Sequence, residues 1–92
     1  MIRQEGDRLL LEGPVTISTV TALLAQAREL LAPGATVLDF KGVTDVDSAA
    51  VALALECLRE AEGRKLPMSF VNLPAALQNL AQLYAVAELL EA

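Results

Sequence analysis

Apolar and polar residues recur with strand or helix periods in seven segments of the chain, in the order ββαβαβα. Four of these segments have the alternation or the β-branched and aromatic content of strands. They are residues 2–5, 7–12, 36–40 and 66–71. A turn at Gly6-Asp7 predicts a hairpin between the first two strands, and Gly13-Pro14 is expected to end the second. We expect residues 41–46 to form a connecting loop.

The other three segments repeat apolar residues at spacings of three and four, which is the period of an amphipathic helix. The first is expected to begin after a cap at Thr16, the second near Asp47 or Ser48, and the third at Pro74. The predicted buried stripes are Ile17, Val20, Leu23, Leu24, Ala27, Leu30 and Leu31; Val51, Ala54, Leu55, Leu58 and Ala61; and Leu77, Leu80, Ala81 and Tyr84. A helical extension is expected over residues 85–92.

Alternating strands and helices predict an α/β fold with crossover helices and at least partly parallel pairing. We expect a four-stranded mixed sheet with helices predominantly on one face. The length of 92 residues and the apolar fraction of 54% fit one domain, residues 1–92, with its own core.

Charge and hydropathy exclude several classes of partner. Seven basic residues against twelve acidic ones give a net charge of −5, which argues against nucleic acid and anionic lipid surfaces. Residues 66–87 are uncharged and long enough to span a bilayer, but they contain two prolines and several side-chain amides. We therefore expect no membrane insertion. Without a visible signal peptide and with a lone cysteine, the expected compartment is the cytoplasm.

The residues offer little for catalysis or for cofactors. Histidine is absent, Cys57 is the one cysteine, and no glycine-rich phosphate loop follows a strand, so we expect no cofactor and no zinc site. Asp39, Asp45 and Asp47 could form an acid/base pair or bind a hard cation. A solvated loop with a helix cap is the favoured interpretation of these carboxylates, and core packing is that of Cys57.

One local segment has candidate chemistry, the polar entry into the second helix. Asp47 is placed to accept a hydrogen bond from an early main-chain amide, and Ser48 stands at or just inside the first turn. A hydroxyl at a helix N-terminus is a position for phosphorylation or for partner docking. Simple helix capping by Asp47 or Ser48 is the alternative.

This segment resembles the STAS domain family, named for sulfate transporters and anti-sigma factor antagonists. Val43 to Ser48 resembles the family's hydrophobic loop before an Asp-Ser or Asp-Thr pair, and Val51 to Leu58 is similar to its second helix. Leu9 to Gly13 resembles its strand ending in glycine. The resemblance covers essentially the whole chain and implies the ββαβαβα fold.

Within the family, residues 72–86 are similar to the ending of the small STAS subunits of Mla phospholipid-transport ABC complexes. The resemblance implies a non-catalytic subunit that binds the transporter ATPase and, through it, reaches the membrane permease. It also implies a peripheral place on the cytoplasmic side of the inner membrane. It places the partner contact at Ser48, and because the helix N-terminus has unpaired amides we expect the partner-binding residues to be Asp45, Asp47, Ser48 and Ala49.

The chain departs from the antagonist branch at the residues that follow Asp47. Anti-sigma factor antagonists carry Asp-Ser-Ser-Gly-Leu, and the second serine accepts phosphate from a partner kinase. Ala49 stands at that position here and Ala50 replaces the glycine, so the resemblance favours a constitutive docking subunit. A regulatory phosphoprotein of the antagonist type, phosphorylated at Ser48, remains the alternative.

Overall fold

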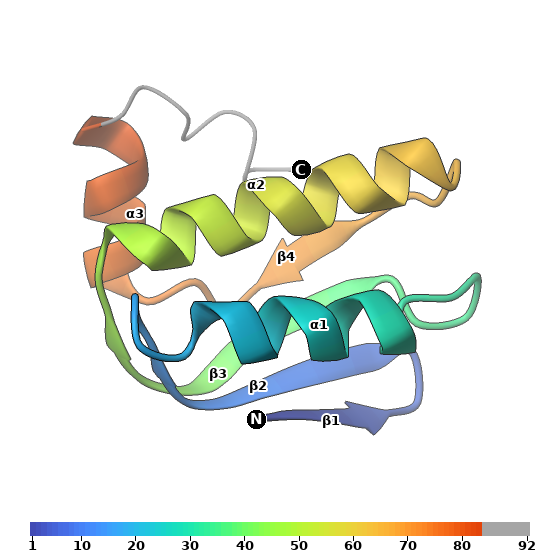
Figure 1. Ribbon diagram of the computed structural model, residues 1–92, viewed down its shortest axis with the longest axis horizontal. Helices are drawn as coiled ribbons and strands as arrows, with labels where there is room; N and C mark the ends of the chain where they lie inside the picture. Colours follow the sequence, from blue (N-terminus) through green and yellow to red (C-terminus); the bar gives the residue numbers. More distant parts are fainter. Residues whose placement is uncertain (84–92) are drawn as a thin grey trace.

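The computed structural model describes residues 1–83 and has the predicted order of elements (Figure 1). The strands are β1 (Ile2–Glu5), β2 (Arg8–Val15), β3 (Val37–Val46) and β4 (Ser69–Val71), and the helices are α1 (Val20–Leu30), α2 (Ser48–Gly63) and α3 (Ala75–Leu83). Tyr84 and the extension expected over residues 85–92 lie outside the described residues. None of the described helices is long and apolar enough to cross a membrane.

The sheet is mixed and four-stranded, with the spatial order β1-β2-β3-β4. β1 pairs antiparallel with β2, whereas β2 with β3 and β3 with β4 are parallel. In the register, Leu9 lies opposite Leu38, and Leu38 lies opposite Phe70. α1 and α2 run side by side over one face, and α3 lies at the end where α2 begins (Figure 1). The α/β fold with helices predominantly on one face is therefore confirmed.

The core lies between this sheet face and the helices. Its largest fully buried side chains are Phe40, Leu9, Leu11, Leu23, Leu38, Leu53, Leu77 and Val15. In α2 the predicted stripe is confirmed at Val51, Ala54 and Ala61, which are buried, but Leu55 and Leu58 are only half-buried. Leu53 and Cys57, which lie outside the predicted stripe, are buried. The reason is that α2 contacts both α1 and α3 and also contributes to the core cluster beside the sheet, so its buried face is broader than a single stripe.

Three strand boundaries differ from the prediction, and one of them is the start of β4, which lies at Ser69 rather than at Leu66. β2 continues through Gly13-Pro14 to Val15, and residues 41–46 belong to β3 rather than to a loop. Proline is tolerated there because the register of β1 with β2 ends at Leu11, which leaves the amide side of Pro14 without a neighbouring strand. Gly42 allows the two strands to approach, since a Cβ on it would lie 2.9 Å from the Leu11 carbonyl oxygen.

α1 begins later than the sequence indicates, so the placing of Ile17 in the buried stripe is wrong. The carbonyl of Thr16 accepts hydrogen bonds from the amides of Thr19 and Val20, at 3.0 and 2.9 Å, which makes a turn before the helix. Thr19, not Thr16, is the residue at the helix boundary. The side chain of Ile17 projects from this turn and is 76% exposed.

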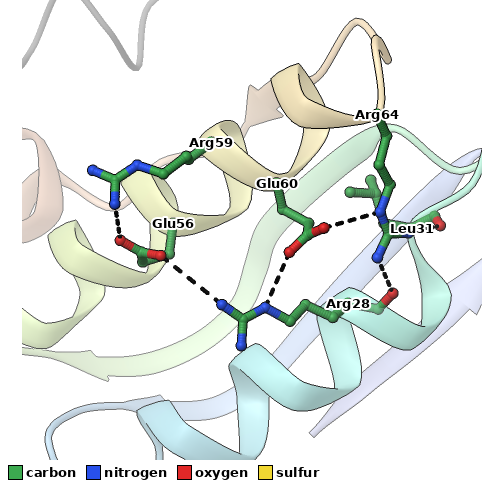
Figure 2. Close-up of polar contacts among 6 residues, drawn as sticks. All are labelled: Arg28, Leu31, Glu56, Arg59, Glu60 and Arg64. Atoms are coloured by element: carbon green, nitrogen blue, oxygen red, sulfur yellow. Dashed lines mark hydrogen bonds and ion pairs between the residues drawn. The ribbon is translucent and has the colours of Figure 1, made fainter.

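A charged cluster joins α1 to α2 toward their C-terminal ends (Figure 2). It consists of Arg28, Glu56, Arg59, Glu60 and Arg64. Glu60 accepts from Arg28 Nε and from Arg64 Nε, each at 3.1 Å. Arg64 also donates to the main-chain carbonyls of Leu31 at 2.9 Å and Arg28 at 3.0 Å. Its guanidinium therefore satisfies carbonyls that the end of α1 leaves unpaired.

Candidate functional site

The candidate site lies where the parallel strands end and the helices begin, on the left in Figure 1. Because β2, β3 and β4 are parallel, their connections to α1, α2 and α3 all emerge at this end of the sheet. Ligands and partners of open α/β sheets commonly use the same end. The segment from Asp45 to Ala49 is the connection from β3 to α2.

Asp47 is the cap of α2 and also its link to the neighbouring turn. Its backbone is extended, and its Oδ1 accepts a hydrogen bond from the amide of Ala49 at 2.8 Å. Its Oδ2 accepts from the amide of Ile17 at 3.0 Å. One carboxylate thus satisfies an unpaired amide of α2 and fixes the turn before α1 against it. The capping interpretation of Asp47 is confirmed.

The other predicted residues differ in exposure. Ser48, the first residue of α2, is exposed, and so is Asp45 near the end of β3. Ala49 is only 8% exposed, because the first turn of α2 already packs into the core. Ser48 and Asp45 are therefore available to a partner, whereas Ala49 offers little surface.

A shallow groove of about 200 Å³ runs beside Asp45, between the end of β3 and the start of α3. It is lined by Val43, Thr44, Asp45, Val46, Pro74 and Ala76. The sequence did not predict this groove, because it forms from an unexpectedly long strand and a helix start far along the chain. No basic residue is among those that line it.

Ile17 is the second feature that the sequence missed. Its turn is held by the Thr19 hydroxyl, which accepts from the Thr16 amide at 3.0 Å and donates to the Pro14 carbonyl at 2.9 Å. Two threonines spaced three apart before an apolar helical run were the available signal, since such hydroxyls compete with helical hydrogen bonds. The turn places an exposed isoleucine beside the start of α2.

Asp39 does not join Asp45 and Asp47. It lies inside β3, and its carboxylate accepts hydrogen bonds from Arg8 at 2.9 Å, from the Lys41 amide at 2.9 Å and from Asn72 at 3.0 Å. Burial tends to raise the pKa of the Asp39 carboxyl, but these donors outweigh it and hold the pKa below its usual range. Asp39 therefore fastens β2, β3 and the turn after β4 together.

Two other candidates from the sequence are a carboxylate pair or cation site that includes Asp39, and the thiol of Cys57. Along an extended strand, Asp39 and Asp45 are separated by roughly 20 Å, too far for a carboxylate pair. Within residues 1–83, no three acidic or cysteine side chains come together in a way that would hold a metal ion. Burial raises the pKa of the Cys57 thiol to about 11, so the side chain packs in the core as a neutral thiol.

A family model described as "Mlab, STAS domain" matches residues 2–91. Among solved structures, the anti-sigma factor antagonist SpoIIAA in its unphosphorylated form superposes with a TM-score of 0.71 at 17% identity, covering 96% of this chain and 82% of that chain. A structure described as "Crystal Structure Analysis of Mglu" superposes at 0.61 with 23% identity, over 82% of this chain and 20% of that chain. No curated protein matches. At these identities the structural likeness concerns the fold.

Proposed function

Since the chain belongs to the STAS domain family, we propose that it is an MlaB-like, non-catalytic subunit of a phospholipid-transporting ABC complex. It binds the ATPase of that complex, supports its assembly and activity, and reaches the membrane permease through it. Its place is then the cytoplasmic surface of the inner membrane. The observation that carries the proposal is the match of the MlaB-labelled family model to residues 2–91.

The local geometry supports docking over a phosphorylation switch. Ala49 takes the position at which antagonists carry their phosphate-accepting serine, and it has no hydroxyl and is 8% exposed. Ser48 is exposed on the first turn of α2, next to the end of β3. A surface of this kind is suited to a constitutive protein contact.

A second candidate is a regulatory phosphoprotein of the antagonist type. It is favoured by the fold likeness to SpoIIAA and by the exposed Ser48 hydroxyl at a helix N-terminus, where backbone amides favour added negative charge. Asp45 and Asp47 oppose it, since both would repel a phosphate. Mass spectrometry of the chain isolated from cells distinguishes the two: a stoichiometric phosphate on Ser48 would support the switch.

The proposed function is tested by capture of the transporter ATPase on the purified chain. Ser48→Arg introduces a bulky cation at the first turn of α2 and is expected to abolish capture, while the melting temperature stays near native. Ser48→Ala removes at most one hydrogen bond and should weaken binding by about 0.5–1.5 kcal/mol. Ala32→Arg, an exposed site at the other end of the molecule, is the matched control and should leave capture unchanged.

Two outcomes would count against the proposal. If the wild-type chain does not retain the ATPase, the assigned partner is wrong. If the wild type and Ser48→Arg retain it equally, the interface lies elsewhere on the chain, although the assigned partner stands.

A further inference from the structure

We propose that Ile17 is the apolar anchor by which the chain binds its partner, and that Asp47 positions Ile17 by accepting its main-chain amide. The partner then presents an apolar pocket edged by lysine or arginine. This inference rests on the proposed function, because it takes the transporter ATPase as the partner. The docking surface consists of Ile17, Ser48, Asp45 and the groove beside Asp45.

Ile17 has no role in the core of the folded chain. Among the described residues, the large hydrophobic side chains that stand exposed are Met1, Ile17 and Leu83, and Ile17 is 76% exposed. Its apolar surface is available to a partner, and the burial of such a surface favours association. Such a side chain can act as an anchor for a partner when its main chain is also held in place.

The main chain of Ile17 is held in place. Its amide donates to Asp47 Oδ2 at 3.0 Å, and the flanking Thr16 and Thr19 are joined through the Thr19 hydroxyl. The β-branched side chain adds its own restriction at χ1. Binding through such a residue orders little that is not already ordered, so little conformational entropy is lost.

Asp47 acts through Ile17 rather than on the partner. Each of its carboxylate oxygens already accepts a main-chain amide, one from Ala49 and one from Ile17. These two bonds fix the spacing between Ile17 and Ser48, which lie on different elements. Asp47 is thus a positioning residue for the docking surface.

Charge defines the rim of the complementary surface. Residues 14–19, 43–48 and 73–76, which form this end of the molecule, contain Asp45 and Asp47 and no lysine or arginine. Asp45 is exposed beside the groove of about 200 Å³, and the whole chain carries a net charge of −5. The exposed Asp45 carboxylate, two residues from the Asp47 that holds Ile17, fits a partner with an apolar pocket and a basic residue at its edge.

The test measures the dissociation constant between the purified ATPase subunit and variants of the full chain. Ile17→Ser should weaken binding about tenfold or more, because it removes most of the apolar surface that the anchor buries. Ile17→Val, which keeps a β-branched apolar side chain, should stay within about threefold of the wild type. Leu83→Ser alters an equally exposed side chain, also 76%, at the end of α3, and should leave binding unchanged.

A double-mutant cycle tests the role of Asp47. Asp47→Asn keeps one oxygen to cap α2 but turns the second acceptor into an amide donor that faces the Ile17 amide. We expect weaker binding, with no additional loss when Asp47→Asn is combined with Ile17→Ser. Additive losses would show that Asp47 affects binding independently of Ile17 and would overturn its role in positioning Ile17.

Salt completes the test. Affinity should fall as ionic strength rises, and Asp45→Asn should reduce that dependence, since it removes the exposed charge of the rim. Wild-type binding with an unaffected Ile17→Ser variant, or loss through Leu83→Ser instead, overturns the inference and leaves the proposed function intact. Failure of the wild-type chain to bind overturns both.

Discussion

At each end of the α1–α2 pair one charged side chain joins the two helices, and the two side chains have opposite charge. At the N-terminal end, the Asp47 carboxylate accepts one amide from α2 and one from the turn before α1. At the other end, the Arg64 guanidinium, just beyond α2, donates to two carbonyls at the end of α1. Helix N-termini carry partial positive charge and C-termini partial negative charge, so each end has the side chain that complements it. Both helices follow parallel strands, which brings like ends together.

The two ends differ in what they leave at the surface. Arg64 belongs to the charged cluster, in which the exposed side chains are already ion-paired with one another. Asp47 joins its two segments alone and leaves Ile17 and Ser48 beside it exposed. One end therefore holds the helices with its charged side chains already paired, whereas the other holds them and leaves exposed the residues that we propose contact a partner.

The largest effect is expected from the packing that joins the two ends. Leu53→Ala removes a fully buried side chain of α2 and should lower the free energy of unfolding by about 2–5 kcal/mol. Leu55→Ala, at a half-buried position two residues later, should cost clearly less. Urea unfolding measures both, and an equal cost would mean that the buried face of α2 is assigned wrongly.

Breaking the C-terminal end alone comes next. Arg64→Leu removes the hydrogen-bond donors to α1 and should lower the free energy of unfolding by about 1–2 kcal/mol. The loss is smaller than for a fully buried charged side chain, because Arg64 is partly exposed. Arg59→Leu, which loses one exposed ion pair with Glu56, is the control and should cost less than about 0.5 kcal/mol. Arg64→Leu should still bind the ATPase; a loss of binding comparable to Ile17→Ser would contradict the division between the two ends.

The smallest effect on the free energy of unfolding is expected from Asp39, in the sheet beneath both ends. Burial raises the pKa of its carboxyl and so partly cancels the lowering by its three hydrogen bonds. Its pKa in the folded chain is lowered, so its contribution is present above the unfolded pKa of about 3.9 and is lost as pH falls through the folded pKa. The free energy of unfolding should therefore fall less between pH 7 and pH 3 in Asp39→Asn than in the wild type. Parallel pH profiles would refute this.

The start of α2 was predictable because capping is local chemistry: Asp47 and the amide it accepts are two residues apart. The start of α1 was not, since the amide of Ile17 is held by a carboxylate thirty residues later. An apolar residue one turn before a helical stripe has the same period whether or not the helix includes it. The sequence therefore indicated half of the surface that we propose for docking and assigned the other half to the core.

Strand ends show the same limit. Residues 41–46 alternate too weakly to indicate a strand, and β3 continues there because its main chain pairs with β2. Asp39 interrupts an apolar run and therefore suggested the end of a strand. It is nevertheless buried inside β3, where Arg8 of β2 and Asn72, just after β4, donate hydrogen bonds to its carboxylate. The order of elements follows from local patterns, whereas these details depend on neighbours brought in by the fold.

The parallel register of β2 with β3 has a consequence for the chain during its synthesis. Leu9 and Leu38 lie opposite each other on the neighbouring strands β2 and β3, and the whole of α1 lies between them in the sequence. A chain that has emerged only as far as α1 holds the β1–β2 hairpin, which is marginal by itself, and nothing yet covers the second edge of β2. Closing that long loop costs entropy before any of the pairing is gained. We therefore expect stable folding to wait until β3 and α2 have left the ribosome, when both ends of the helix pair form together.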